Sequence, residues 1–190
     1  MCYFKSFYKE LGIRALDADE KDLKEISQMV IQVKEKNSKI IIVGNGGSAG
    51  IASHLAVDFT KAIKIRAITF SDPSLITCFG NDYGYENWVK KAIEFYGKPN
   101  DLVILISSSG QSENIVLGAK KALAMGLEVV TLSGFKEDNP LRSLGTKNLY
   151  TRSNVYNIVE NIHQIWLTVL VDFIREATPY GKSISKRLKK

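Results

Sequence analysis

Two loops rich in serine and glycine carry the groups best suited to bind an anion. Residues 44–50 read Gly-Asn-Gly-Gly-Ser-Ala-Gly, and residues 107–112 read Ser-Ser-Ser-Gly-Gln-Ser. Each loop follows a short apolar run, at 40–43 and at 102–106, and precedes a segment with helical periodicity. A strand that turns through small residues into a helix directs backbone N–H groups at one point, and serine hydroxyls add donors. Two such loops on one sheet predict a pocket for a phosphorylated small molecule.

Four titratable side chains have spacings that suit either acid–base chemistry or metal binding. His54 and Asp58 are four residues apart in the helical segment after the first loop, so they share one helix face. Glu160 and His163 are three residues apart in an apolar segment near the C-terminus. A carboxylate buried there needs a partner. Spacing alone leaves two interpretations open for these residues: a catalytic or metal-binding set, or hydrogen-bonded structural pairs.

A nucleotide cofactor is the weaker interpretation of the first loop. Residues 44–50 approach a dinucleotide-binding fingerprint, but the last glycine is displaced by one position. NAD binding, with Asp72 as the ribose-binding acid, gives the second serine loop no role. No Gly-Lys-Ser/Thr sequence follows either loop, which excludes a Walker phosphate loop. We therefore expect no nucleotide cofactor.

The elements that must position these loops alternate along the chain. Strands are expected at 39–44, 66–70, 101–107, 127–133 and 147–151, and helices near 48–62, 73–79, 84–97, 112–125, 139–144 and 155–176. Repeated βα units predict a parallel sheet covered by helices on both faces, with ligands beyond the carboxyl ends of the strands. Residues 6–37 predict one long helix, or two joined near residue 18, that packs against a neighbouring subunit.

The composition favours a single cytoplasmic domain of 190 residues. The sequence shows no signal peptide and no apolar run long enough for a membrane span. Cys2 and Cys78 form neither a disulfide framework nor a zinc knuckle, and Cys78 is expected to be a small buried hydrophobe. Most of the net charge of +6 comes from the basic end of the chain, which argues against nucleic acid as a partner.

Several motifs, taken in order, resemble one known family. The residues at 44–49, 71–72, 80–84 and 107–112 resemble the sugar isomerase (SIS) domain, and within it the phosphoheptose isomerases. The resemblance implies a three-layer α/β/α sandwich with a five-stranded parallel, flavodoxin-like sheet. It divides the chain into an N-terminal helical extension (1–38), the SIS domain (39–178) and a basic tail (179–190). It also implies a homotetramer with sites at subunit interfaces.

The activity implied by the resemblance is the isomerisation of sedoheptulose 7-phosphate to a heptose 7-phosphate, or of a related sugar phosphate. In the family this step serves precursors of lipopolysaccharide or surface glycans. The substrate-binding positions carry over onto Asn45, Gly46, Gly47, Ser48, Asn81, Asp82, Ser107, Ser108, Ser109, Ser112 and Glu160. The serine loop among them holds the phosphate in the family.

The acid–base positions depart from the family pattern. Where the family has a histidine followed four residues later by a glutamate, this chain has His54 and Asp58. Where the family has a glutamine followed eight residues later by a histidine, this chain has Glu160 and Thr168. These four positions bind zinc in some members, and the glutamate and second histidine are the acid–base pair. We therefore expect Asp58, Glu160 and His163 to share proton transfer, or His54, Asp58 and Glu160 to hold zinc. The alternative is a non-catalytic sugar-phosphate-binding regulator or scaffold, like the bacterial DnaA-initiator-associating protein.

Overall fold

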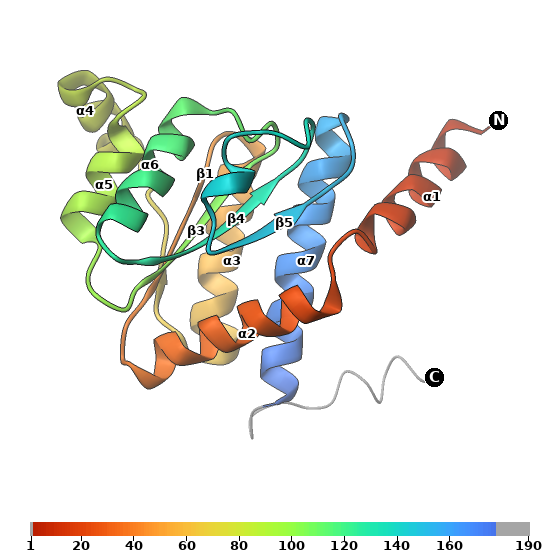
Figure 1. The fold of residues 1–190 in the computed structure, drawn as a ribbon, viewed down its shortest axis with the longest axis horizontal. Coiled ribbons are helices and arrows are strands. Elements are labelled where there is room, and N and C mark those ends of the chain that lie inside the picture. The colour runs from red at the N-terminus through yellow and green to blue at the C-terminus, as the bar shows by residue number, and fades with distance from the viewer. Residues whose placement is uncertain (1, 178–190) are drawn as a thin grey trace.

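A sheet of five parallel strands forms the centre of the molecule (Figure 1). The computed structural model describes residues 2–177, so the predicted basic tail lies outside the described residues. In chain order the strands are β1 (Ile40–Gly44), β2 (Ala67–Ile68), β3 (Leu102–Ser107), β4 (Glu128–Ser133) and β5 (Lys147–Tyr150). Their order across the sheet is β2-β1-β3-β4-β5, with every neighbouring pair parallel. The predicted five-stranded parallel sheet is confirmed.

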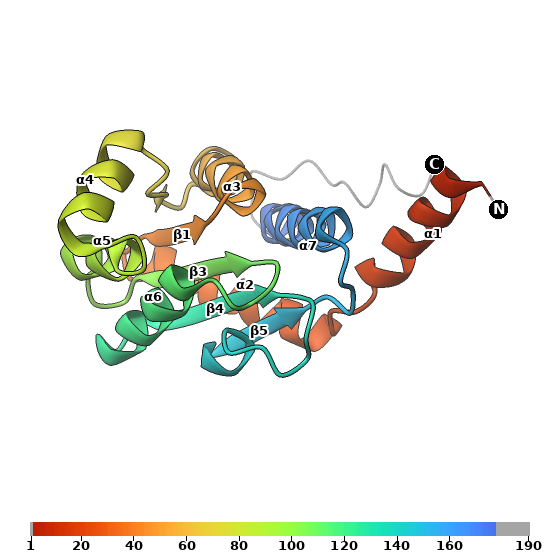
Figure 2. The same cartoon turned by 90° about the horizontal axis from the view of Figure 1, so that it is seen from above.

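Helices cover both faces of this sheet and complete three layers (Figure 2). The helices are α1 (Tyr3–Ala15), α2 (Glu20–Glu35), α3 (Gly47–Ile63), α4 (Pro73–Tyr83), α5 (Trp88–Tyr96), α6 (Glu113–Ala124) and α7 (Tyr156–Glu176). Side chains alternate between the two faces of a strand. Ile40 and Ile42 accordingly pack with α2, α3 and α7, whereas Ile41 and Val43 pack with α5 and α6. Within the described part of the chain, no helix combines the length and apolar character that a bilayer span requires.

The N-terminal segment forms two helices, and they differ in burial. Asp19 separates them and caps α2, because its carboxylate accepts a hydrogen bond of 2.7 Å from the backbone N–H of Lys21. The inner face of α2 is buried in the core, but α1 contains no buried residue. The indole N–H of Trp166 on α7 donates to the carbonyl of Ala15 and holds the end of α1. Phe7 and Leu11 are partly buried against the core, and the N-terminal part of α1 projects from the body of the molecule (Figure 2).

Four expectations about the segment between β1 and β5 are corrected. Strand β2 contains only two residues instead of five, and the helix expected at 139–144 is one 3₁₀ turn, η1 (Arg142–Leu144). Helix α4 continues to Tyr83 and so includes most of the 80–84 motif. Cys78 is exposed, because α4 packs only its other face, with Leu75 and Phe79, against the core. The prediction that Cys78 is buried is therefore wrong.

Candidate functional site

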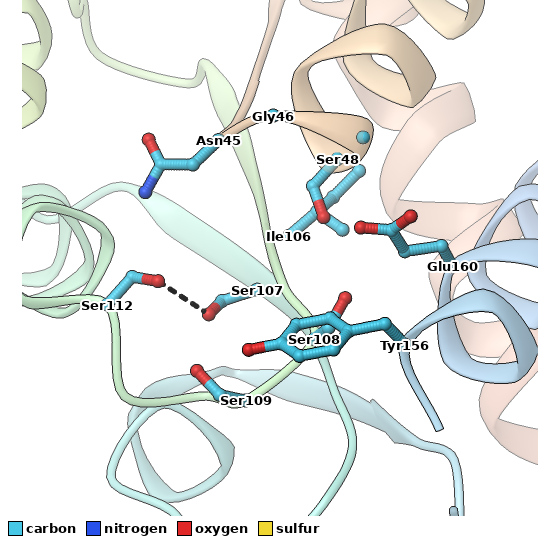
Figure 3. Close-up of a pocket in the computed structure, with 11 residues that line it drawn as sticks. Asn45, Gly46, Ser48, Ile106, Ser107, Ser108, Ser109, Ser112, Tyr156 and Glu160 are labelled. Atoms are coloured by element: carbon cyan, nitrogen blue, oxygen red, sulfur yellow. Dashed lines mark hydrogen bonds between the residues drawn. The ribbon is translucent and has the colours of Figure 1, made fainter. Parts of the chain in front are cut away.

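The two serine- and glycine-rich loops leave the sheet side by side. In the parallel register of β1 and β3, Gly44 pairs with Ile106, so both strands end at the same edge. A pocket of about 290 Å³ opens between the loops (Figure 3). It is lined by Asn45, Gly46, Gly47, Ser48, Ile106, Ser107, Ser108, Ser109, Ser112, Tyr156 and Glu160. Its volume is close to the lower end of the range of about 300–1,000 Å³ for small-molecule pockets.

The second loop presents hydroxyl groups at the N-terminus of α6. Ser107 donates a hydrogen bond of 3.1 Å to the hydroxyl of Ser112, the N-cap residue of α6, and Ser112 makes no capping bond with its own side chain. Ser109 accepts a 3.2 Å hydrogen bond from the backbone N–H of Gln111. The buried hydroxyl of Ser108 has no hydrogen-bond partner among the described residues. The pocket therefore combines unused donors with the positive end of a helix dipole, which suits a phosphate group.

The first loop is held in place by a pair of amide side chains. Asn45 and Asn114 each donate to the other's side-chain oxygen at 2.9 Å, and so join the first loop to α6. Gly46, the N-cap residue of α3, has a φ of 53°, a backbone conformation that glycine adopts without the steric cost that other residues meet. The N-termini of α3 and α6 consequently border the same pocket, one on each loop.

One carboxylate faces this pocket. Glu160 lies on the first turns of α7, is half-buried, and sits on the opposite side of the pocket from Ser112 (Figure 3). Its side chain rests against Gly47 in the first turn of α3. A negative charge at a helix N-terminus is stabilised by the helix dipole. The structure thus places the second serine loop and a carboxylate at opposite sides of one cavity.

His54 and Asp58 form a pair outside the pocket lining. The Nε2 atom of His54 lies 3.2 Å from Oδ2 of Asp58, as expected for residues four apart on α3. The other ring nitrogen, Nδ1, lies 2.9 Å from Nε2 of Gln164 on α7. Thr168, one turn further along α7, donates its hydroxyl hydrogen bond to backbone carbonyls of its own helix.

His163 lies in the protein core. Its side chain is 0% exposed, and Nε2 is 3.2 Å from the backbone carbonyl of Ser133, to which it donates. Burial lowers the pKa of His163 to about 4, because the charged form is poorly solvated there. It does not line the pocket. The structure therefore argues against the expected share of His163 in proton transfer to a substrate.

Comparison with known proteins identifies the family. The sequence profile of the SIS domain matches residues 3–134. The chain belongs to the SIS domain family. A phosphoheptose isomerase from Fusobacterium nucleatum subsp. nucleatum is 33% identical over 161 residues, which is 82% of each protein. A phosphoheptose isomerase from Helicobacter pylori strain P12 is 32% identical over 173 residues, 88% of this chain and 90% of that one.

A solved structure gives the same fold for this SIS domain. The phosphoheptose isomerase from Neisseria gonorrhoeae superimposes with a TM-score of 0.83, covering 90% of this chain and 94% of that one. At 23% sequence identity the likeness shows the shared α/β/α architecture. The sequence relatives place the chain among the isomerases of the family.

The expected zinc set does not come together in this SIS domain. Within residues 2–177, no three His, Cys, Asp or Glu side chains are close enough to one another to hold a metal ion. Glu160 rests on Gly47 at the pocket, whereas His54 contacts both Asp58 and Gln164. The described residues of the expected set therefore do not fit a bound zinc ion.

Two more predicted binding residues lie away from the pocket. Asn81 and Asp82 are exposed on the last turn of α4 and bond to each other at 2.9 Å, so they do not line the cavity. Asp72 caps α4 by accepting from the backbone N–H groups of Ser74 and Leu75. Because this carboxylate serves a helix end, nothing in its geometry supports the NAD alternative.

Tyr156 is a pocket residue that sequence reasoning missed. It begins α7 four residues before Glu160, so a signal was present in the helical spacing. Its ring meets the ring of Phe135 edge to face, with 4.7 Å between centroids. Phe135 has a φ of 60°, and its carbonyl accepts a 2.7 Å hydrogen bond from the hydroxyl of Tyr150. The loop after β4 thereby supports Tyr156 at the edge of the pocket (Figure 3).

Proposed function

We propose that this isomerase interconverts an aldose phosphate and a ketose phosphate, with sedoheptulose 7-phosphate as the ketose. The supporting observation is the pocket in which the serine loop of α6 faces the carboxylate of Glu160. The phosphate binds at the N-terminus of α6, and the other end of the sugar points toward Glu160. The names of the sequence relatives support a heptose phosphate as the substrate.

Glu160 is the group we assign to proton transfer between carbons. In the aldose-to-ketose direction its carboxylate removes the proton from C2, and the electron pair forms the double bond of an enediol. The resulting carboxylic acid returns a proton to C1 as the carbonyl forms at C2, so that the net change is isomerisation. A second group must move the proton between the two oxygens. Glu160 is preferred over Asp58 because only Glu160 lines the pocket.

The cellular setting and assembly belong to the same proposal. The enzyme acts in the cytoplasm on precursors of surface glycans or lipopolysaccharide, and it assembles as a homotetramer. Support for assembly comes from α1, which has no buried residue and exposes several large apolar side chains. Exposed apolar clusters of this kind commonly mark interfaces between proteins.

A proton-exchange assay tests the proposal. The protein is incubated with sedoheptulose 7-phosphate in deuterated water, and solvent deuterium at C1 or C2 is followed together with the aldose product. Glu160→Gln should lower both rates by about 10²-fold or more, the usual scale for a general acid–base group, while sugar-phosphate binding persists. Glu128→Gln, at an exposed position at the start of β4, is the matched control and should be unchanged.

The outcomes separate an isomerase from a binding protein. Binding without exchange or turnover in the unmodified protein would reject catalysis and favour the regulator or scaffold. Turnover that survives Glu160→Gln would assign the proton transfer to another group.

A further inference from the structure

The ring of His54 is held from two sides, by two different helices. Gln164 of α7 approaches Nδ1 with its amide nitrogen at 2.9 Å, and Asp58 of α3 approaches Nε2 with a carboxylate oxygen at 3.2 Å. Gln164 and Asp58 are each half-buried, whereas His54 is largely exposed. Helices α3 and α7 pack against each other in the same core, so this contact joins two rigid elements.

Both contacts require the same tautomer of His54. An amide nitrogen carries only hydrogens to donate, so Nδ1 must accept and carry no proton. An ionised carboxylate can only accept, so Nε2 carries the proton and donates it to Asp58. The contacts with Gln164 and Asp58 therefore favour the same tautomer of His54, in which the neutral ring is protonated at Nε2.

This arrangement leaves no nitrogen of His54 free for a metal. Metal ligation by histidine uses an unprotonated ring nitrogen, and the only one here is engaged by Gln164. The position matched to the second histidine of the family's zinc set is also occupied, because the Thr168 hydroxyl bonds to backbone carbonyls of its own helix.

We propose that Gln164 is a positioning residue that replaces the metal of zinc-binding relatives: it fixes the tautomer and orientation of His54 and, through His54, holds Asp58. The isomerase accordingly works without zinc, a consequence that rests on the proposed function. The tautomer itself does not depend on that function, so it can be tested separately.

Nitrogen NMR of the imidazole rings measures the tautomer directly. The chain contains two histidines, so the ¹⁵N spectrum of histidine-labelled protein is simple, and His54→Gln identifies the His54 signals. At alkaline pH, where a free imidazole is neutral, His54 should show a protonated Nε2 and an unprotonated Nδ1. One equivalent of zinc chloride should leave these signals unchanged. A proton on Nδ1, or a shift of the His54 signals with zinc, overturns the proposal.

Two variants test whether Gln164 is responsible. Gln164→Leu removes the donor, and His54 should become a mixture of tautomers. Gln164→Glu keeps the side-chain shape but offers only acceptors, so Nδ1 should become protonated. This near-isosteric variant keeps the test decisive if Gln164→Leu does not fold. Gln32→Leu, at an exposed position on α2, is the control and should leave the His54 signals unchanged. Unchanged signals in both Gln164 variants reject the positioning role.

Turnover adds an independent measurement. Protein treated with a chelator should keep its full kcat. Zinc-dependent turnover overturns the proposal. If the unmodified protein has no turnover under any condition, the proposed function fails, and the NMR result still decides the role of Gln164.

Discussion

The carboxylate of Glu160 occupies the space that a side chain at residue 47 would fill. A Cβ atom added to Gly47 would lie 2.6 Å from the carboxyl carbon of Glu160, closer than such atoms approach in proteins. Glycine at this position therefore lets a residue on α7 reach the N-terminus of α3. This close approach gives a reason for glycine at position 47, which anion binding by the first loop does not by itself require.

Gly47→Ala should displace Glu160 and lower kcat. We expect a loss of at least tenfold, because a misplaced catalytic group costs far more in rate than in stability. The matched control is Gly50→Ala in the same helix, where an added Cβ meets nothing within 4 Å. Gly50→Ala should keep kcat and raise the free energy of unfolding by up to about 1 kcal/mol. Equal kcat values in the two variants would contradict the importance of this close approach.

The serine loop should account for phosphate affinity. We expect Ser109→Ala combined with Ser112→Ala to weaken sugar-phosphate binding at least tenfold, or about 1.4 kcal/mol. The reason is the loss of two hydroxyls beside the α6 N-terminus and of the bond from Ser107. Titration calorimetry measures the affinity, and circular dichroism checks the fold. Ser143→Ala, at an exposed site in η1, is the control. Unchanged affinity in the double variant would place the phosphate elsewhere.

His163 should make the fold less stable in mild acid. Its pKa is about 4 in the folded chain, below the ordinary value of about 6.5, so the unfolded chain binds more protons between these pH values. The stabilisation is fully present above about pH 6.5 and is lost as the pH falls toward 4, by up to about 3 kcal/mol. Urea unfolding at several pH values across this range measures the slope of the unfolding free energy against pH.

The slope can be assigned to His163 by substitution. His163→Gln removes the titrating ring, and its unfolding free energy should vary less with pH in this window. His54→Gln changes the exposed histidine and should retain the slope. If the slope persists in His163→Gln, another group causes it.

The exposed side of α1 should mediate assembly. Its large apolar side chains include Phe4, 65% exposed, and Tyr8, 66% exposed, four residues apart on one face. Introducing charge there with Phe4→Glu and Tyr8→Glu should reduce the mass measured by light scattering at micromolar concentration. Lys5→Glu with Lys9→Glu changes the charge of two other exposed α1 positions and should leave the mass unchanged. A monomeric unmodified protein would reject the proposed tetramer outright.

The sequence by itself determined the sheet and the two loops. Buried parallel strands have continuous apolar sequences. The turn from a strand into a helix that binds an anion uses glycine and serine. Each of these two sequence signals lies within a few neighbouring residues, so it can be recognised without the tertiary structure. The same local logic left one long helix or two helices joined near residue 18 as alternatives, and the structure has two helices separated at Asp19. Adjacency of the loops then followed from the doubly wound order, in which β1 and β3 are neighbours.

Only the tertiary structure decided which polar side chains meet. Gln164 and His54 are 110 positions apart in the sequence, and their contact depends on how α7 packs on α3. His163 and Glu160 share one helix, yet one is buried against Ser133 and the other faces the pocket. Helical spacing gives the relative directions of side chains but not which direction faces the core. That choice is set by the packing of α7 between the sheet, α3 and α1, and it separates the carboxylate in the pocket from the histidine in the core.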